Sequence, residues 1–480
     1  MKRPASMMPV VAVAAALTLA ACASGPDYRK PALDLPAAWT PEAPWRSMQP
    51  QDAVARGPWW ERFGDAQLNA LQQQALAGNQ TLAIATARLA QARAQLNVAG
   101  AAQAPQVGLS TRAGRGRISA NRPLTNYNAP NYATVQNDFA LGLNVSYEMD
   151  FFGRVQRSVE AAGASAQQSA ADLENTRLLL TAELASNYFN LRELDIELDV
   201  VQRAIALQRK ALELATSRHD LGATSGLDVA QQQALLDNTL TQVDVLGRQR
   251  AQYEHAIATL IGVSASSFSL PQMPLNPTLP SIPMGVPSQL LERRPDIAGA
   301  ERRTQAANAQ IGIAISAYYP NVTLSGAGGF ASSQAGTWIQ GPSALWSLGG
   351  SAVELLFDAG RRHAITDQAR DAYEAQTANY RQSVLNAFQE VEDNLAALRI
   401  LNDEAATQNA AVQASIRSLN LSTSRYKGGV TTYLEVLTAQ TTQLSNQRTQ
   451  ADITTRQFAA SVQLIKALGG GWDTSQLPQM

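Results

Sequence analysis

The sequence predicts a mainly α-helical fold with four β-strands, built from two tandem copies of one unit. Three observations support this prediction. Residues 155–218 form a stretch of 64 residues without proline and with a single glycine, which favours one helix of roughly 96 Å at about 1.5 Å per residue. Segments of strictly alternating apolar and polar side chains indicate strands. The segment SRHDLGATSGLDV at 217–229 recurs as SRYKGGVTTYLEV at 424–436, 207 residues later.

The first element is a segment typical of a signal peptide. Lys2 and Arg3 precede an apolar run at 7–21, which is too short to span a membrane comfortably. We expect residues 1–21 to be a signal peptide and residues 22–65 to be an N-terminal segment. Cys22 is the only cysteine, so no disulfide can form within the chain.

The sequence Leu19-Ala20-Ala21-Cys22 resembles the processing box of bacterial lipoproteins. This resemblance implies cleavage before Cys22 and acylation of that cysteine, and Ser24 at the second following position favours the outer membrane. Several acyl chains on one residue anchor a protein stably without a spanning helix. We therefore expect a covalent lipid on Cys22 and contact with outer membrane lipids.

The two repeats are expected at 66–262 and 290–469, with the proline-rich residues 263–289 as linker and 470–480 as a C-terminal tail. Each repeat predicts a helix, a hairpin of two strands, a long helix, a turn and a second helix. The long helices, the second without proline or glycine at 361–427, predict coiled-coil packing. Upstream of the helices the repeat distance is 215, because the first copy is eight residues longer between Pro105 and Gly153. Such an insertion belongs in a surface loop.

The strands are expected at about 105–118, 136–148, 319–330 and 344–357. The clearest, DFALGLNVSY at 138–147, has the alternation of a membrane-spanning strand, although a strand of a soluble antiparallel sheet shows the same pattern. Its expected lipid-facing residues are Phe139, Leu141, Leu143, Val145 and Tyr147. In the last strand Trp346, Leu348, Gly350 and Ala352 take the same face, and an extra residue between Glu354 and Gly360 suggests a bulge.

Four strands in lipid leave two edges with unpaired backbone groups, each costing several kcal/mol, so only a closed barrel is viable. Two chains give eight strands, and the interior of a barrel of that size is filled by side chains. Three chains give twelve strands around a water-filled bore. We therefore expect a homotrimer with a twelve-stranded β-barrel.

The repeated segment predicts a tight turn between two antiparallel helices. Gly222 and Gly429 suit the left-handed conformation at a helix end. Ser225 and Thr432 suit the first cap of the next helix, and Asp228 and Glu435, three residues further on, complete the spacing of a capping box. These features are explained equally well by a helical hairpin without further function.

Several motifs together resemble the outer membrane factor family, the TolC-like efflux ducts, and in particular its OprM/NodT lipoprotein branch. They are PWWERFGDAQLNAL (58–71), ERRPDIAGAERR (292–303), IGIAISAYYPNVTLSG (311–326), LFDAGRR (356–362), SRYKGGVTTYLEVLTAQ (424–440) and LIKALGGGW (464–472). The resemblance covers nearly the whole mature chain. It implies a trimeric outer-membrane barrel continued by an α-helical barrel in the periplasm, docked through a periplasmic adaptor to an inner-membrane pump.

By the same resemblance the periplasmic aperture lies at the two helical turns. The candidate tip and gate residues are Arg218, Gly222, Thr224, Leu227, Asp228, Arg425, Tyr426, Gly429, Thr431, Leu434, Glu435 and Thr438. The family pattern places a leucine and, four residues later, an aspartate at the closed tip. Leu434 matches, but Thr438 stands at the acidic position. We hypothesise that Arg218 and Arg425 pair with Asp228 and Glu435 to hold the tip closed.

Other classes of function have little support in the sequence. The 38 basic and 39 acidic residues balance, which gives no indication of nucleic acid binding. His219, His255 and His363 have no metal-ligand spacing, and no phosphate loop or nucleophile elbow is present, so we expect no enzyme, metal or cofactor. Two alternatives stay open: a duct for type I protein secretion, and a lipid-anchored coiled-coil scaffold without a pore.

Overall fold

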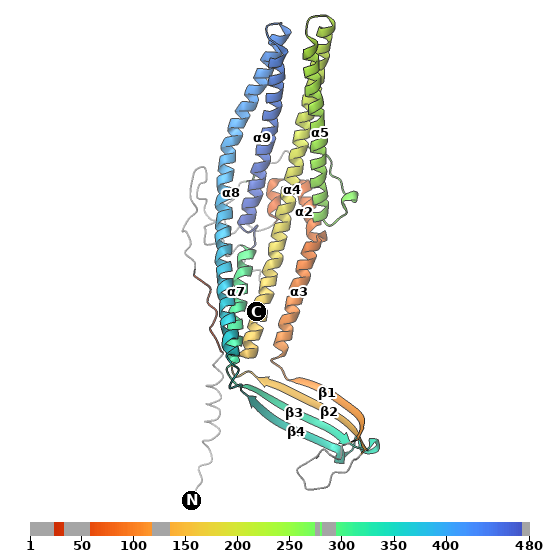
Figure 1. Cartoon of the computed structure of the whole chain (residues 1–480), viewed down its shortest axis with the longest axis vertical. Helices are drawn as coiled ribbons and strands as arrows, with labels where there is room; N and C mark the ends of the chain where they lie inside the picture. Colours follow the sequence, from red (N-terminus) through yellow and green to blue (C-terminus); the bar gives the residue numbers. More distant parts are fainter. Residues whose placement is uncertain (1–23, 33–57, 118–134, 274–278, 281–293, 473–480) are drawn as a thin grey trace.

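The computed structural model describes residues 24–32, 58–117, 135–273, 279–280 and 294–472. It is an elongated molecule with two helical hairpins at one end and a β-sheet at the other (Figure 1). The first half contains η1 (Trp59–Phe63), α2 (Ala66–Gly78), α3 (Gln80–Ala101), β1 (Gln106–Arg117), β2 (Val135–Met149), α4 (Arg154–Asp220), α5 (Gly226–Leu260) and η2 (Ala265–Ser267). The second half contains α7 (Pro295–Ser316), β3 (Asn321–Ser332), η3 (Ala335–Thr337), η4 (Gly341–Ser343), β4 (Ala344–Val353), α8 (Arg361–Lys427) and α9 (Tyr433–Ala467).

The tandem duplication is confirmed element by element. The long helices α4 and α8 have 67 residues each, and α5 and α9 have 35 residues each, at the repeat distance seen in the sequence. The strands β1 and β3 both have 12 residues. The eight additional residues of the first copy therefore fall between the end of β1 and the start of α4, in the half that contains the longer strand–strand connection.

The four strands form one antiparallel sheet in the order β1-β2-β3-β4. The prediction of four strands is confirmed, but the last one ends at Val353 rather than at 357. The prediction of a bulge between Glu354 and Gly360 is also wrong, because these residues lie beyond the end of the strand. The ladder of β3 with β4 runs without interruption to Val353, and the chain then leaves the sheet through a turn in which Ala359 has a positive φ of 54°.

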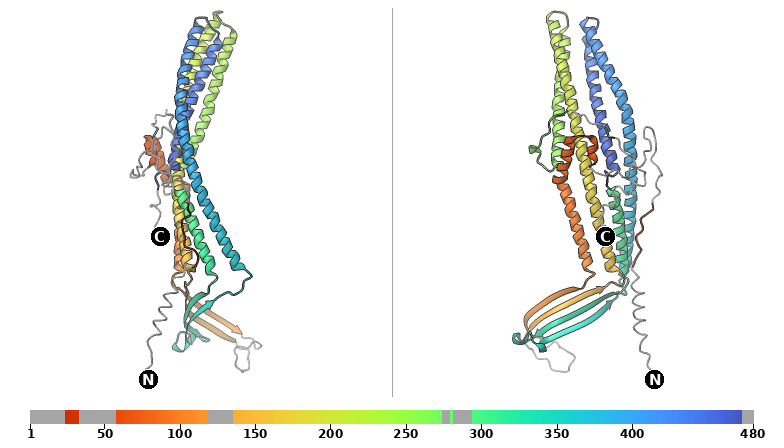
Figure 2. Two further views of the ribbon diagram at one scale, coloured as in Figure 1. Left: turned by 90° about the vertical axis from the view of Figure 1, so that its left-hand side faces the viewer. Right: turned by 180° about the vertical axis from the view of Figure 1, so that it is seen from behind.

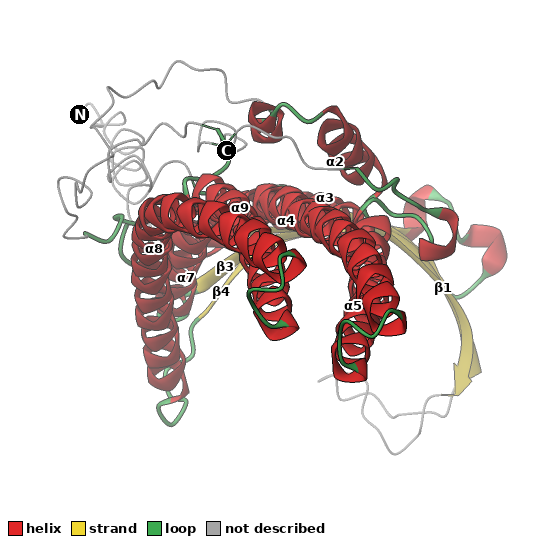
Figure 3. Ribbon diagram, turned by 90° about the horizontal axis from the view of Figure 1, so that it is seen from above, coloured by secondary structure: helices red, strands yellow, loops and turns green. Residues whose placement is uncertain are grey.

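The helices stand side by side in a curved row instead of surrounding a central core. Seen along the long axis, α8, α9, α4 and α5 follow one arc (Figure 3). The two side views show the hairpins α4–α5 and α8–α9 extending together away from the sheet (Figure 2). Such an arc is a sector of a cylinder, and its two ends are open to further copies.

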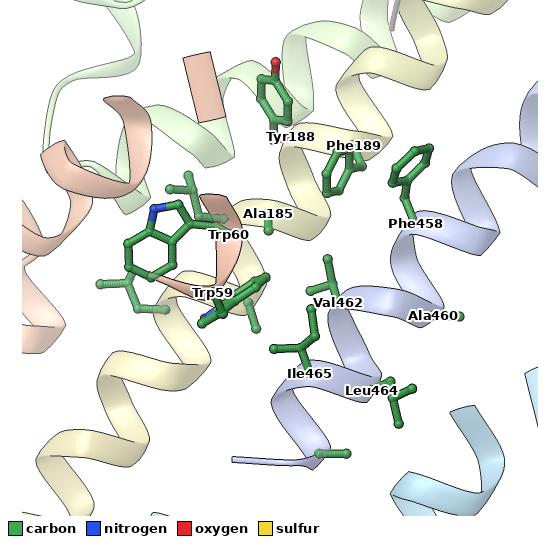
Figure 4. Packing of buried hydrophobic residues seen from close by; sticks show 14 of the residues in the cluster. Trp59, Trp60, Ala185, Tyr188, Phe189, Phe458, Ala460, Val462, Leu464 and Ile465 are labelled. Atoms are coloured by element: carbon green, nitrogen blue, oxygen red, sulfur yellow. The ribbon is translucent and has the colours of Figure 1, made fainter. Parts of the chain in front are cut away.

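The largest hydrophobic cluster joins the middle of α4 and α8 to the C-terminal ends of α5 and α9, and so connects the two repeats. Figure 4 shows part of it from close by. Phe63 of η1 packs on Phe189 of α4, and Phe189 stacks on Phe458 of α9, each with ring centroids 4.9 Å apart. Trp59 donates its indole N–H to Thr181 Oγ1 at 3.3 Å. This cluster fixes the positions of α4 and α9, and hence of both hairpins. Within the described ranges, no helix combines the length and the apolar character that crossing a membrane requires.

Candidate functional site: sheet and hairpin tips

One face of the sheet is apolar across all four strands. The register places Leu109 opposite Leu143, Leu143 opposite Gly328, and Gly328 opposite Trp346, so residues of equal parity share a face. Polar side chains on this face include Thr111 and, next to the β1–β2 connection, Arg115, Arg117 and Asn137. Its large apolar residues include Val107, Leu109, Phe139, Leu141, Leu143, Val145, Tyr147, Val322, Leu324, Phe330, Trp346 and Leu348. Trp346 and Leu348 are each 83% exposed in the single chain. An apolar face of this extent, left uncovered by the chain itself, requires an apolar environment.

The opposite face of the sheet is polar and small. It carries Ser110, Arg112, Asp138, Asn144, Ser325 and Ser347 with several glycines. Arg112 Nη2 lies 2.6 Å from Asp138 Oδ2 across β1 and β2, and Asn144 donates to Ser110 Oγ at 3.1 Å. The edge strands β1 and β4 each pair on one side only, so both edges of the sheet keep unpaired backbone groups. The geometry is that of one segment of a larger barrel with a wet interior.

At the other end of the molecule, each hairpin turn begins with the same helix-ending motif. The N–H of Gly222 donates to His219 O, and the N–H of Ala223 donates to Arg218 O, each at 2.8 Å. Gly429 and Val430 make the equivalent bonds to Tyr426 O and Arg425 O at 3.0 Å. Both glycines have φ of 73°. The predicted role of these glycines is confirmed, because only glycine adopts this left-handed conformation without strain.

The caps of the following helices are only partly as predicted. Ser225 is the N-cap of α5, and its hydroxyl accepts from Leu227 N at 3.1 Å rather than from the amide of Asp228. Thr432 is the N-cap of α9 but makes no side-chain capping bond. The helix starts are therefore where the sequence places them, but neither capping box forms. Instead, the N–H of Asp228 donates to the backbone carbonyl of Ser225 at 3.1 Å, and the N–H of Glu435 donates to that of Thr432 at 3.3 Å.

A pair of tyrosines joins the two hairpin tips. The rings of Tyr426 and Tyr433 pack at 4.9 Å, and both are buried. The Arg218 guanidinium lies 4.9 Å from the centre of the Tyr426 ring and donates to Tyr426 O at 3.2 Å. The Tyr433 hydroxyl donates to Gln232 Oε1 of α5, and Gln232 donates in turn to Gln208 O of α4 at 3.1 Å. Contacts from α8 and α9 thus hold α4 and α5.

Burial dominates the electrostatics of this tyrosine pair. It raises the pKa of the Tyr426 hydroxyl, and the nearby Asp228 carboxylate adds to this rise. Burial raises the pKa of the Tyr433 hydroxyl as well. Both rings therefore stay neutral under physiological conditions.

The predicted ion pairs at the tips are not found within one chain. Among the described residues no salt bridge joins Arg218 or Arg425 to Asp228 or Glu435. Arg218 is half-buried against Tyr426 instead, whereas Arg425 and Glu435 are exposed. The physical reason is the burial of Tyr426, which offers Arg218 an aromatic face and a carbonyl at the same place.

The other candidate tip residues lie around the two turns as the repeat predicts. Leu227 and Leu434 are exposed, at 61% and 60%, and so is Val430. Thr224 and Thr431 are half-buried in the turns. Thr438 is exposed on the first turns of α9, and its hydroxyl donates to Leu434 O at 2.9 Å. The two tips therefore present an uncovered apolar surface at the far end of the rod.

Sequence reasoning missed Tyr433 and Gln232. The signal for Tyr433 was the repeat itself, because Gly226 stands at the equivalent position of the first copy. In that copy His219 lies over Gly226, with its Nδ1 3.1 Å from Thr224 O. Gln232 carries no comparable signal, since a glutamine on a long polar helix is normally solvent-exposed.

A water-accessible cavity of about 420 Å³ lies between α4, α5 and α9, away from the tips. Glu193 and Glu197 of α4 face Asp452 and Arg448 of α9 across it, with Gln242 contributed by α5. Burial raises the pKa of Glu193 to about 7, and the carboxylates of Asp452 and Glu197 contribute to the rise. Arg448 opposes it and pairs with Glu197 at 3.3 Å. No group of three His, Cys, Asp or Glu side chains in the described part of the chain is arranged to hold a metal ion.

The sheet and the helical arc together define one protomer of an outer-membrane channel. Residues 71–263 and 286–470 match the family model of the outer membrane efflux proteins, and the chain belongs to this family. It is an efflux protein of the outer membrane. The resemblance to the TolC-like ducts is thereby confirmed.

Relatives and solved structures extend over almost the whole chain. The pyoverdine export outer membrane protein OpmQ of Pseudomonas aeruginosa is 31% identical over 98% of both chains. The cation efflux system protein CusC of Escherichia coli is 29% identical over 95% of this chain and 97% of its own. The structure of the outer-membrane channel OprN superposes with a TM-score of 0.86 at 30% identity, covering 94% of this chain and 100% of the other. The open state of the Neisseria gonorrhoeae channel MtrE matches with a TM-score of 0.81 at 27% identity, covering 94% and 98%.

Proposed function

We propose that the chain is one protomer of a trimeric duct that conducts substrates passively from the periplasm to the exterior. The observation that carries this proposal is the four-stranded sheet, with one apolar face, one polar face and two open edges, on a rod of helices that forms an arc. Three copies give twelve strands, enough for a water-filled bore. A duct of this kind needs no catalytic group and no cofactor.

The apolar face of the sheet is proposed to contact lipid, through Phe139, Leu141, Leu143, Val145 and Tyr147 of β2 and the equivalent residues of the other strands. The signal peptide (1–21) and Cys22 lie outside the described residues. We propose that Cys22 is acylated and adds a covalent anchor to the same membrane. Anchoring by lipid and by a barrel together favours the outer membrane as a permanent location.

The hairpin tips are proposed to form the periplasmic mouth, where a periplasmic adaptor docks and an inner-membrane pump supplies the energy. Six turns ring this mouth in a trimer, two from each protomer. Their exposed leucines and Val430 offer an apolar contact surface. The contacts of Arg218 and Tyr433 hold the two tips of a protomer together, and we propose that opening requires these contacts to loosen.

Planar bilayer recording tests the duct directly. Purified wild-type protein is expected to give discrete conductance steps, which a pore-less scaffold does not give. The absence of steps from both the wild type and Arg218→Ala, in protein that still migrates as a heat-modifiable trimer, would contradict the proposal.

Isolation of the native complex, after chemical cross-linking in cells, tests the partners. Co-purification of an adaptor and an energised pump for small molecules or metal ions supports efflux. A type I exporter with a bound polypeptide instead supports the alternative, protein secretion.

A further inference from the structure

Two cavities lie between the hairpin α4–α5 and α9, in the stretch that separates the largest hydrophobic cluster from the tips. The larger one, of about 420 Å³, is lined by α4 at Glu193 and Glu197 and by several residues of α9. The smaller one, of about 160 Å³, lies nearer the tips and is lined by α4 at 203–208. Leu444 of α9 lines both cavities and packs on apolar residues of α4 and α5. The contact between the hairpins is thus hollow on both sides of this leucine.

The α9 wall of the larger cavity is polar. Thr441, Ser445 and Thr449 line it at steps of four residues, so their side chains share one face of the helix. A polar cavity of this volume holds several water molecules, since each needs about 30 Å³. Protons can therefore reach the carboxyl groups in its wall from the solvent.

The one basic group in the lining of this cavity is committed to Glu197. Arg448 of α9 donates from Nε to Glu197 Oε1 at 3.3 Å and from Nη2 to Glu197 Oε2 at 3.4 Å. Its Nη1 donates to Gln242 Oε1 at 3.4 Å. Of α5, which the structure describes throughout, only Gln242 lines the cavity, so this helix adds no charge. The pair of Arg448 with Glu197 joins the two hairpins across the cavity.

Glu193 is left as a surplus carboxyl group. Asp452, which faces it from α9, pairs with Arg456 at 3.6 Å, and Arg456 also pairs with Glu404 of α8 at 3.5 Å. Glu193 itself is half-buried and makes no hydrogen bond or ion pair with any residue that the structure describes. When it ionises, its nearest acidic neighbours are Glu197 on its own helix and Asp452 across the cavity.

The charge of Glu193 changes in the physiological range of pH. Burial raises its pKa to about 7, the carboxylates of Asp452 and Glu197 add to the rise, and Arg448 opposes it. Like charges on facing helices repel, and the repulsion is stronger away from bulk water. Above this pKa an additional negative charge therefore stands between α4 and α9.

We propose that the larger cavity is a pH-sensitive switch on the duct: neutral Glu193 lets α4 and α9 stay together, and ionised Glu193 repels Asp452 and separates the hairpins. The same hairpins are joined at their tips by Arg218 and Tyr433, so separation at the cavity favours an open mouth at neutral and alkaline pH. Acid favours the closed mouth. The switch occurs once in each protomer, because Ile400 stands at the equivalent position of the second copy. This inference rests on the proposed duct.

Planar bilayer recording at pH 5.5 and pH 8 tests the switch. If opening returns the pKa of Glu193 by about one unit toward its ordinary value, the open fraction of wild type should rise roughly five- to tenfold between these values. Glu193→Gln stays neutral and should keep the low open fraction at both. Asp452→Asn should weaken the response, because one of the two repelling carboxylates is lost. Glu213→Gln, an exposed position of α4, is the matched control and should respond like wild type.

A second measurement does not depend on conductance. A nitroxide label on Leu434→Cys, at an exposed tip position, is introduced in a Cys22→Ser background, and pulsed electron paramagnetic resonance measures the separation of the labels within a trimer. We expect longer separations at pH 8 than at pH 5.5, and no such change when Glu193→Gln is added.

The two measurements separate failure of the switch from failure of the duct. Conductance steps whose dependence on pH is the same in wild type and Glu193→Gln would overturn the switch and leave the duct. Tip separations that do not change with pH would overturn the switch as well. Separations that depend on pH and on Glu193, in protein without conductance steps at either pH, would contradict the duct but support the movement of the hairpins.

Discussion

At the hairpin tips, side chains that differ between the two copies make the contacts that join those copies. The first copy has His219 and Gly226 where the second has Tyr426 and Tyr433. The two tyrosines pack on each other in the second hairpin, and they contact Gln232 and Arg218 of the first. Arg425, the repeat equivalent of Arg218, is exposed. Arg218 and Arg425 therefore occupy equivalent positions of the repeat, but only Arg218 contacts the tyrosine.

Replacement of Arg218 by alanine is expected to loosen the closed tip. The change removes a cation–π contact and a hydrogen bond from a charged donor, together about 1–3 kcal/mol, so the open fraction should rise roughly fivefold or more. Planar bilayer conductance of the purified trimer measures this fraction. Arg425→Ala is the control and should leave it unchanged. Equal effects of the two substitutions would show that the Tyr426 contact does not hold the tip.

Glu193 is expected to make stability depend on pH. Its pKa is about 7 in the folded protein against an ordinary value of 4.5, so the folded state binds the proton more tightly. The resulting stabilisation is complete below the ordinary value and is lost as pH rises through about 7. Thermal unfolding between pH 5 and 8 should show a smaller decline for Glu193→Gln than for wild type. Glu213→Gln, an exposed position of the same helix, is the control, and a decline as large as that of wild type in Glu193→Gln would refute the assignment.

At the scale of elements, each strand of the sheet places alternate side chains on an apolar face and on a polar face. Leu348 and Ser347 are neighbours in the middle of β4, and their side chains leave opposite faces. Leu348 lies on the apolar face with Trp346, whereas Ser347 lies on the polar face with Ser325 as a near neighbour on β3. The same chemical change at these two positions should therefore have two different results.

Leu348→Arg is expected to impair assembly in the membrane, because an arginine facing the middle of the bilayer costs about 2–4 kcal/mol per strand. Ser347→Arg should preserve assembly and change conductance or ion selectivity instead. The amount of heat-modifiable trimer in outer membranes measures the first effect, and bilayer recording measures the second. Normal assembly of Leu348→Arg, together with impaired assembly of Ser347→Arg, would mean that Ser347 and not Leu348 faces the lipid.

The sequence predicts the long elements well because their signals are long. Residues 155–218 contain nothing that breaks a helix, and the duplication repeats the same prediction in α8. Predictions of individual side-chain hydrogen bonds and ion pairs are wrong where another contact of the folded chain takes the same group. Ser225 and Asp228 have capping-box spacing, but the serine bonds Leu227 N instead. Arg218 was expected to find a carboxylate, and the buried ring of Tyr426 holds it.

Two further features were beyond the reach of sequence patterns. The described N-terminal residues 24–32 have no periodicity, and their contact with α4 depends on Arg157, which is separated from Asp27 by 130 residues. The cavity at Glu193 is lined by α4 and α9, whose residues there are still further apart in the sequence. Both require the three-dimensional arrangement of the arc, whereas the sequence specifies only its parts.

At the scale of the whole molecule, the protomer has an open row of helices and an open sheet, and association with further copies closes both. Its helices form an open arc, and its sheet ends in two unpaired strands. Because the sheet has four antiparallel strands, β4 of one copy meets β1 of the next in antiparallel orientation, and any number of copies keeps the whole barrel antiparallel. Pairing of edges therefore sets no copy number by itself. The width of the bore favours three, because eight strands leave an interior filled by side chains.

Cross-linking between the edge strands tests this number. In a Cys22→Ser background, cysteine at Leu109 of β1 is combined with cysteine at Trp346, Leu348 or Gly350 of β4, positions on the same face of the sheet. Oxidation in outer membranes should produce covalent species up to three chains in the pair that matches the register. Cysteines at Leu143 and Gly328, opposite each other on β2 and β3, are the control and should cross-link within one chain. A product that stops at two chains would indicate an eight-stranded barrel, whose filled interior is incompatible with a duct.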